Sequence, residues 1–177
     1  MIEIRIIDEK NCNDIRIPNE PFELIGRVIP SYVDEKWSYR VAYADESERG
    51  EMCFPDEDYR FDEMKGNSTF LGAYDGDRCI GLLILQDAWL RYAYLYDLKV
   101  AREYRRRGVA SMLLQRADEV CRSRGYGGIY VVAQDNNVGA CLFYLNRGFH
   151  IGGLDTGVYK GSNQEGKSDL IFYRDCE

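Results

Sequence analysis

The stretch Arg102-Glu103-Tyr104-Arg105-Arg106-Arg107-Gly108-Val109-Ala110 lies between two segments with different hydrophobic patterns. Before it, Ala93–Val100 is rich in Tyr and Leu and predicts a strand. After it, apolar side chains recur at three- and four-residue spacing, which predicts a helix that ends at Gly125. The apolar positions of this helix are Val109, Met112, Leu113, Ala117, Val120 and Cys121. The stretch is therefore predicted to be a strand-to-helix turn.

Positive charge crowds this turn, because four of its nine residues are arginines. The start of a helix already carries partial positive charge, so arginines there are unfavourable unless an anion lies beside them. Residues 104–110 also contain no Ser, Thr, Asp or Asn to cap the first N–H groups. A pyrophosphate would accept those N–H groups and neutralise the arginines, and Gly108 would let it approach the backbone. The alternative is that water satisfies the N–H groups and the arginines lie along the surface; the position after a strand, in an acidic chain, favours a phosphate ligand.

Length and charge limit the classes of protein that fit. The chain has 177 residues and a formal charge of −7, and residues 1–66 alone carry a net −8. The length predicts a single domain over residues 1–177. An acidic chain disfavours nucleic acid as the anion and would attract a cationic small molecule, although a solvated acidic surface is the simpler alternative. Because no apolar stretch approaches about 18 residues and the start lacks a signal-peptide pattern, we expect a cytoplasmic protein without membrane association.

The cysteines and the histidine exclude several kinds of site. Six cysteines are scattered without a C-x-x-C pair, and His150 is the only histidine. This composition predicts neither a structural metal site nor a Cys-His or Ser-His-Asp nucleophile. We expect reduced cysteines and a reaction by direct attack, without a covalent enzyme intermediate.

Strand and helix signals alternate on both sides of the turn. Upstream, two strand-like runs enclose Asp75-Gly76-Asp77 and predict a hairpin. Downstream, a short buried strand precedes a second helix, and two strands close the chain. The expected elements are strands at Ile2–Ile7, Thr69–Tyr74, Cys79–Leu85, Gly128–Ala133, Phe149–Tyr159 and Asp169–Tyr173, and a helix at Asn137–Asn146.

The region from Pro18 to about Met64 lacks a clear period and is interrupted by prolines. We expect short helices and loops there. Five apolar residues in this region are spaced as one face of a helix: Phe22, Leu24, Ile25, Val28 and Ile29.

Two motifs carry a resemblance to a known family. Arg105-x-x-Gly108-x-Ala110 at a strand-to-helix turn resembles the coenzyme A pyrophosphate loop of the GNAT superfamily of N-acetyltransferases. About thirty residues later, Asn137-x-x-Ala140-x-x-Phe143-Tyr144-x-x-x-Gly148-Phe149 is similar to the second motif of that superfamily. The resemblance covers residues 69–159. It implies a single-domain α/β GNAT fold with a mixed, mostly antiparallel central sheet, splayed around acetyl-CoA and flanked by helices.

The resemblance also implies an acetyl-CoA-dependent N-acetyltransferase without a metal. Backbone amides around Leu98–Val100 would hold the pantetheine arm, and one of them could stabilise the oxyanion. Asn137 would contact the cofactor near its thiol end. The implied cofactor-binding residues are Leu98, Lys99, Val100, Arg105, Arg106, Arg107, Gly108, Val109, Ala110, Ser111, Asn137 and Ala140.

Tyr144 matches the general-acid tyrosine of the superfamily. A departing thiolate resembles a thiol of pKa about 8.5, which a tyrosine hydroxyl can protonate. An aromatic residue at helical spacing is more often a core residue; the spacing to Asn137 and Gly148 favours the catalytic interpretation.

The general base is less well defined. Some relatives place a glutamate five residues before the asparagine of the second motif, but this chain has Val132 there. Asp97 is the nearest acidic candidate for the base, and the alternative is a solvent-facing or substrate-binding carboxylate. Asp87 and Asp155 are weaker candidates, and ordered water could also remove the proton of the amine.

Within the superfamily, Leu95–Val100 and Phe149–Lys160 are most similar to streptothricin acetyltransferases, which confer resistance by acetylating an amine of the antibiotic's β-lysine chain. This similarity implies a small cationic amine as substrate. Aromatic residues next to acidic ones would suit a cation, or are ordinary packing: Trp37, Trp89, Tyr92, Tyr94 and Tyr96. The alternatives are a general small-amine, polyamine or protein N-terminal acetyltransferase, and a non-catalytic CoA-binding sensor. The oligomeric state stays open, and a homodimer is compatible with the sequence.

Overall fold

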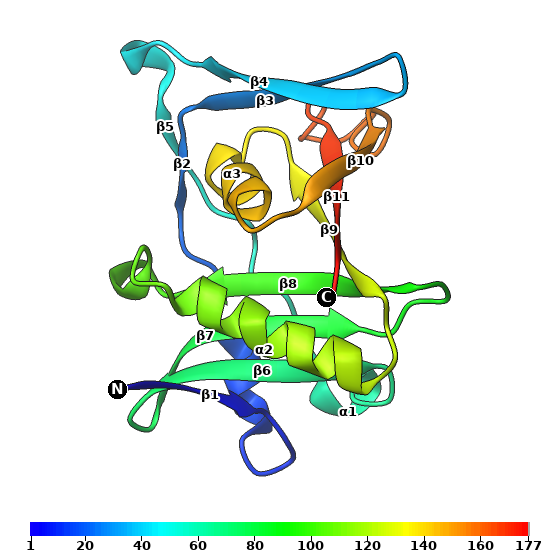
Figure 1. Cartoon of the computed structure of the whole chain (residues 1–177). Helices are drawn as coiled ribbons and strands as arrows, with labels where there is room; N and C mark the ends of the chain where they lie inside the picture. The colour runs from blue at the N-terminus through cyan, green and yellow to red at the C-terminus, as the bar shows by residue number, and fades with distance from the viewer. Residues whose placement is uncertain (177) are drawn as a thin grey trace. The chain divides into compact units, whose positions relative to one another are not determined.

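The computed structural model describes residues 1–176, which form two compact units (Figure 1). Unit 1 consists of Met1–Glu20, Phe54–Ile129 and the C-terminal residues from Asp175 on. Unit 2 consists of Pro21–Cys53 and Tyr130–Arg174. No helix in the described part of the chain has the length and apolar character needed to cross a membrane.

Unit 1 is built on four antiparallel strands in the order β1-β6-β7-β8. Their bounds are Ile2–Ile6 (β1), Ser68–Asp75 (β6), Arg78–Gln86 (β7) and Tyr92–Val100 (β8). The β6–β7 hairpin turns at Gly76, whose φ of +63° favours glycine. The predicted hairpin and the predicted strands on either side of it are thus confirmed.

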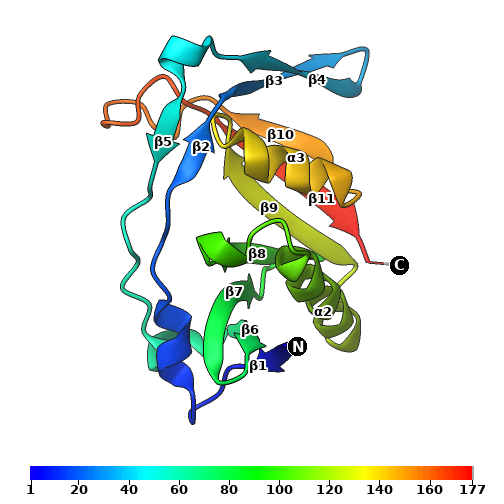
Figure 2. The ribbon, with the colours of Figure 1, turned by 90° about the vertical axis from the view of Figure 1, so that its left-hand side faces the viewer.

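Helix α2, Val109–Ser123, packs along one face of this sheet, as Figures 1 and 2 show. Its fully buried residues include Leu113, Leu114 and Ala117, as the helical spacing predicts. The opposite face is covered by the 3₁₀ helix η1, Cys12–Arg16, and the short helix α1, Phe61–Met64. The side chains that pack on this face are Ile7, Ile15, Tyr59, Phe70, Leu82 and Ile84.

A β-bulge interrupts the pairing of β7 with β8. Ile84 pairs with Asp97, whereas Leu85 pairs with Leu95, so Tyr96 is the extra residue on β8. A bulge locally redirects the side chains of the strand that carries it. As a result, the side chain of Tyr96 is half-exposed, whereas the side chain of Asp97 is more enclosed.

Unit 2 contains two short antiparallel pairs and a strand–helix–strand region. Its strands are β2 (Phe22–Leu24), β3 (Gly26–Val33), β4 (Lys36–Tyr43), β5 (Gly50–Met52), β10 (His150–Asp155), β11 (Asp169–Asp175) and most of β9 (Gly128–Gln134). Helix α3 spans Val138–Asn146, and the 3₁₀ helices η2 and η3 span Glu46–Glu48 in unit 2 and Arg102–Tyr104 in unit 1. Buried Tyr144, Phe149 and Phe172 form an aromatic group in the core of unit 2.

The expectation of short helices and loops from Pro18 to about Met64 is wrong for residues 22–52, where β2 to β5 lie, and so is the prediction of a helical face at residues 22–29. These residues form β2 and β3; β3 pairs with β4 through a turn at Asp34-Glu35. Both turn residues have positive φ, 49° and 60°, the backbone of a two-residue hairpin turn that usually carries Asn-Gly. Because Asp-Glu is a poor signal for such a turn, the sequence pattern did not reveal this hairpin. The predicted strand at 149–159 is also shorter, since β10 ends at Asp155.

Candidate active site

The turn before α2 has the geometry of an anion-binding loop. Gly108 is the N-cap residue of α2, with φ +84° and no side-chain capping hydrogen bond. Arg106 also has positive φ, +60°, which is uncommon for a residue with a side chain. A Cβ placed on Gly108 would meet nothing within 4 Å, so the space beside its backbone is open. The helix N-terminus therefore presents N–H groups to an open surface, where an anionic group could accept hydrogen bonds from them.

The arginines of this turn divide into two roles. Arg105 donates from Nε to the carbonyl of Val100 at 3.0 Å and from Nη2 to the carbonyl of Glu20 at 3.1 Å. These bonds fix the turn against the end of β8. Arg106 and Arg107 are exposed, and the Arg107 guanidinium lies 5.4 Å from the ring centroid of Tyr104. The exposed pair is thus the part of the cluster that can meet a phosphate.

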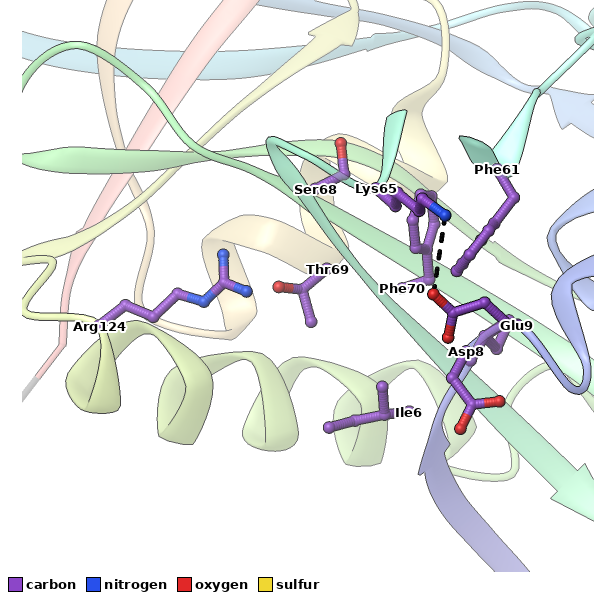
Figure 3. A pocket seen from close by; sticks show the side chains of 10 residues that line it. Ile6, Asp8, Glu9, Phe61, Lys65, Ser68, Thr69, Phe70 and Arg124 are labelled. Carbon is purple, nitrogen blue, oxygen red and sulfur yellow. Dashed lines mark ion pairs between the residues drawn. The ribbon is translucent and has the colours of Figure 1, made fainter. Parts of the chain in front are cut away.

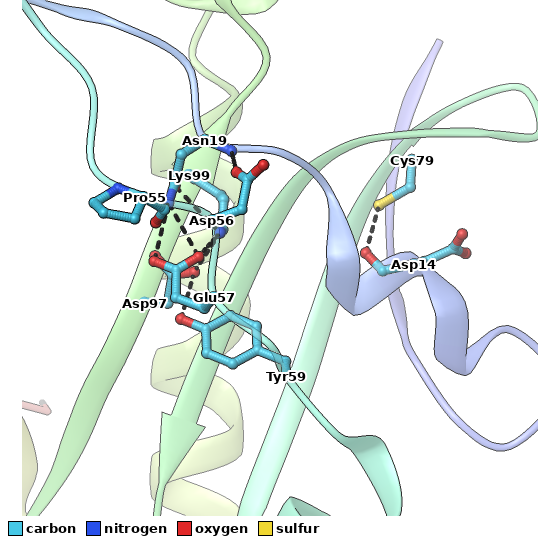
Figure 4. A network of polar contacts seen from close by, with 9 residues as sticks. All are labelled: Asp14, Asn19, Pro55, Asp56, Glu57, Tyr59, Cys79, Asp97 and Lys99. Atoms are coloured by element: carbon cyan, nitrogen blue, oxygen red, sulfur yellow. Dashed lines mark hydrogen bonds and ion pairs between the residues drawn. The ribbon is translucent and has the colours of Figure 1, made fainter.

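A polar network surrounds Asp97 near the end of β8 (Figure 4). Oδ2 of Asp97 accepts a hydrogen bond from the Tyr59 hydroxyl at 3.1 Å, and Nζ of Lys99 lies 3.1 Å from the same oxygen. The Asp97 and Lys99 side chains are only 15% and 10% exposed. The Lys99 ammonium also lies 5.2 Å from the ring centroid of Tyr59. Asp97 is therefore an oriented carboxylate and not a solvated one.

The acidic segment before α1 completes this network. Lys99 donates to Oε2 of Glu57 at 2.7 Å and to Oδ1 of Asn19 at 3.2 Å. Asn19 in turn donates from Nδ2 to Glu57 at 3.0 Å and to the carbonyl of Pro55 at 2.8 Å. Lys99 thus lies between the carboxylates of Asp97 and Glu57. Its contacts join the segments that carry Asn19 and Glu57 to β8.

The network sets the protonation states of its members. Burial raises the pKa of Asp97 above that of an ordinary aspartate, and the neighbouring Lys99 partly opposes this change. Burial alone would lower the pKa of Lys99, but the carboxylates of Asp97 and Glu57 outweigh it and raise that pKa. Burial and the charge of Asp97 raise the pKa of Tyr59, so its hydroxyl remains a donor. The arrangement suits a carboxylate that takes up and releases a proton beside a permanent cation.

The second motif lies in unit 2, where Asn137 is the N-cap residue of α3. Its Oδ1 accepts a hydrogen bond from the amide of Ala140 at 3.1 Å, which leaves Nδ2 as the donor end of the side chain. Asn137 and Ala140, which lie three residues apart in the motif, are therefore joined by this capping hydrogen bond.

Tyr144 lies in the second half of α3 and is 6% exposed. Its ring lies 5.5 Å from that of Phe149 and 5.9 Å from that of Phe172, centroid to centroid. The aromatic contacts fix the ring, as both a core role and a catalytic role require. The hydroxyl therefore has a defined position.

A hollow in unit 1 does not involve the predicted site. It has a volume of about 290 Å³ and lies between β1, α1 and β6, with Lys65, Thr69 and Arg124 on its wall (Figure 3). Lys65 pairs with Glu9 at 3.7 Å and with Asp62 at 2.8 Å. Its cation is thus already neutralised, and none of the predicted site residues lines this hollow.

Sequence reasoning missed the residues that surround Asp97, namely Asn19, Glu57 and Tyr59. They come from segments with no periodic pattern, more than 35 residues away from Asp97 along the chain. The available signal was the net negative charge of residues 1–66, which predicts either attraction of a cation or a solvated acidic surface and does not single out Glu57.

The fold and these motifs define the class of protein. Residues 34–149 match the model of the Acetyltransferase (GNAT) family, and the chain belongs to this family. It has the GNAT fold and is an acetyl-CoA-dependent acetyltransferase.

Known proteins similar to this chain indicate which acetyltransferases it resembles. Streptothricin acetyltransferase A of Bacillus subtilis (strain 168) is 32% identical over 163 residues, which cover 92% of this chain and 94% of the relative. A crystal structure of a candidate streptothricin acetyltransferase from Bacillus anthracis (strain Ames), in complex with acetyl-coenzyme A, is 27% identical with a TM-score of 0.87 and covers 99% of both chains. A nourseothricin acetyltransferase structure has a TM-score of 0.82 over 99% of both chains at 24% identity, and so supports the fold.

Proposed function

We propose that this enzyme acetylates a primary amine of a streptothricin-type antibiotic, in its β-lysine moiety, and thereby inactivates the antibiotic. The observation that carries the proposal is the similarity to streptothricin acetyltransferase A, which extends over nearly the whole of both chains. One N-acetyltransferase domain over residues 1–177 is part of the proposal, because the similar structures cover both units. We also infer a cytoplasmic location, in agreement with six free thiols in the structure.

The residues of unit 1 would bind acetyl-CoA. The exposed guanidinium groups of Arg106 and Arg107 and the N–H groups from Gly108 to Ser111 would hold the pyrophosphate, and Arg105 would position the turn. Backbone amides of Leu98, Lys99 and Val100 would orient the pantetheine arm. In unit 2, Asn137 would donate to the cofactor near its thiol end, and Ala140 would help to fix the cap.

Asp97 would act as the general base. The amine of a lysine-like side chain has a pKa of about 10.4 and is mostly protonated at neutral pH, so a proton must leave before it attacks. Tyr59 and Lys99 hold the Asp97 carboxylate in one orientation, and burial raises its pKa toward the range in which a base works best. Tyr144 would donate the proton that the departing thiolate needs.

The test is thiol release from acetyl-CoA by the purified protein, with streptothricin as acceptor beside lysine, spermidine and a peptide that starts with alanine. We expect turnover with streptothricin and much slower turnover with the others. Turnover confined to spermidine or to the peptide would replace the substrate and keep the enzyme class. An absence of turnover with every acceptor, together with tight acetyl-CoA binding, would favour the alternative of a CoA-binding sensor.

A further inference from the structure

The ammonium group of Lys99 is shared between two carboxylates of unit 1 (Figure 4). Its Nζ lies 2.7 Å from Oε2 of Glu57, 3.1 Å from Oδ2 of Asp97 and 3.2 Å from Oδ1 of Asn19. An ammonium group has three N–H donors, so each of them has an acceptor here. Of these three contacts, the one to Glu57 is the shortest. Glu57 therefore holds Lys99 at least as closely as Asp97 does.

The carboxylate of Glu57 has a fixed position, although its side chain is 34% exposed. Nδ2 of Asn19 lies 3.0 Å from each of its two oxygens and also donates to the carbonyl of Pro55 at 2.8 Å. The backbone amide of Asn19 donates to Oδ1 of Asp56 at 2.6 Å, which ties Asn19 to the residue before Glu57. Glu57 is thus held beside Lys99 and does not extend freely into solvent.

The contact with Glu57 limits how strongly Lys99 acts on Asp97. The side chains of Lys99 and Asp97 are 10% and 15% exposed, so solvent screens their attraction only weakly. In an ion pair of these two groups alone, the cation would favour the charged form of the aspartate and make it a poor proton acceptor. The charge of Glu57 opposes that effect, because two carboxylates and one ammonium leave one negative charge over.

The protonation states of the network agree with this geometry. Burial alone would raise the pKa of Glu57, but hydrogen bonds from Lys99 and Asn19 outweigh burial and lower that pKa, so Glu57 stays ionised. At Asp97, burial raises the pKa, Lys99 lowers it and the charge of Glu57 raises it again. Glu57 and Lys99 thus act on Asp97 in opposite directions.

Other neighbours of Asp97 are two phenols and an apolar side chain. Tyr59 donates its hydroxyl to Oδ2 of Asp97, and burial and the charge of Asp97 raise the pKa of that hydroxyl and keep it protonated. Tyr96, the residue before Asp97 on β8, is the second phenol, and Ile84, opposite Asp97 on β7, does not titrate. Among these neighbours, Glu57 is the one whose charge balances that of Lys99.

We propose that Glu57 is a positioning residue for the general base: it holds the Lys99 ammonium between the two carboxylates, so that Asp97 stays oriented and still accepts a proton. This inference rests on the proposed function, in which Asp97 receives the proton of the amine. Tyr59 and Lys99 both contact Oδ2 of Asp97. Oδ1 takes part in neither contact, and it forms the new O–H bond as the N–H bond of the acceptor breaks. Glu57 acts through Lys99 and takes no proton.

The experiment measures the pKa of Asp97 directly and then its effect on turnover. Glu57→Gln removes the charge and keeps the size of the side chain, and Glu57→Asp keeps the charge. Asp58→Asn is the matched control, because it removes a charge from the next residue, whose exposed carboxylate pairs with Arg60 at 3.3 Å. The pKa is followed by ¹³C NMR of the side-chain carboxyl groups without substrate, and Asp97→Asn identifies the signal. KM and kcat are measured with streptothricin as a function of pH.

In Glu57→Gln, the pKa of Asp97 should fall by about half a unit or more, because Lys99 is left to pair with Asp97 alone. The acidic limb of the kcat/KM profile should move to lower pH by the same amount, since a base works only when deprotonated. Above that limb, kcat should fall about threefold to tenfold, with KM for streptothricin within about twofold of wild type. Glu57→Asp should restore most of both changes, and Asp58→Asn should behave like wild type.

An unchanged pKa of Asp97 in folded Glu57→Gln, or an equal change in Asp58→Asn, would overturn the inference. A raised KM with an unchanged pKa would place Glu57 at the acceptor and overturn it as well. A failure of the proposed function has a different signature, because the NMR titration does not need turnover. Wild type would release no thiol, or Asp97→Asn would keep its kcat, while the pKa of Asp97 still changed in Glu57→Gln. In that case the coupling of the three side chains would stand, and its role in catalysis would not.

Discussion

Asp97 in unit 1 and Asp135 in unit 2 are both enclosed carboxylates, but their surroundings differ. Asp97 faces two donors on one oxygen, and the lysine that neutralises it is shared with a second carboxylate. Asp135 has one oxygen paired with Arg27 and the other buried without a partner. The first arrangement pairs the carboxylate with a hydroxyl donor and a cation of the protein itself, and suits a group that changes its protonation state. The second is an internal ion pair with Arg27 that leaves one oxygen of the carboxylate buried and unpaired.

The substitution with the largest expected effect on this contrast is Asp97→Asn. If Asp97 is the base, kcat should fall by about 10³-fold, because the amide cannot accept the proton, while KM for the amine changes little. Asp135→Asn should keep kcat close to that of wild type, because Asp135 is buried and paired with Arg27. Steady-state kinetics with streptothricin at saturating acetyl-CoA measure both. Similar kinetic patterns in the two variants would remove the distinction between the carboxylates.

Tyr144→Phe is expected to have the next largest effect. Loss of the hydroxyl should lower kcat by about 10²-fold, while the dissociation constant for coenzyme A stays within about twofold, since the ring keeps its packing on Phe149 and Phe172. Tyr130→Phe is a suitable control, because it removes another tyrosine hydroxyl from unit 2. A normal kcat for Tyr144→Phe would assign Tyr144 to the core alone.

Arg106→Glu tests the cationic turn before α2, whose charge is opposite to that of the two carboxylates. Reversal of an exposed charge beside the N-terminus of α2 should weaken acetyl-CoA binding about tenfold. The same substitution at Arg40, which is exposed on β4, should leave the affinity unchanged. Equal affinities of the two variants in a titration with coenzyme A would contradict the anion-site assignment.

The smallest effect is a shift in pH dependence. Lys99 lowers the pKa of Asp97, so Lys99→Met should raise that pKa; a base acts only when deprotonated. The acidic limb of the kcat/KM profile should therefore move to higher pH by about one unit. The charged and titratable groups around Asp97 in unit 1 are Lys99, Glu57, Tyr59 and Tyr96. Lys36→Met, on exposed β4, should leave the profile in place, and an unmoved profile for Lys99→Met would separate Asp97 from the observed titration.

The parts of the fold that the sequence revealed are those with local signals. The helix at Val109 could be recognised from its spacing and from Gly125, and the cap at Asn137 from its motif. The β3–β4 hairpin could not, because Asp34-Glu35 takes a turn conformation that usually needs glycine. The partners of Asp97 and Asp135 were equally hidden, because they are joined to them by contacts between distant segments. Side-chain networks of this kind depend on tertiary pairing, which a single sequence does not display.

Neither unit is a continuous piece of the chain. Unit 1 is interrupted after Glu20 and again after Ile129, and it is completed only by the residues from Asp175 on. The Tyr92 hydroxyl donates to Oδ1 of Asp175 at 2.8 Å, and the amide of Cys176 donates to the carbonyl of Gly127 at 3.0 Å. During synthesis on the ribosome, unit 2 therefore cannot be completed before Arg174 has emerged, nor unit 1 before Asp175 has emerged. Folding of unit 1 should therefore be completed late, and removal of the contacts made by Asp175 and Cys176 should affect strands that are synthesised much earlier.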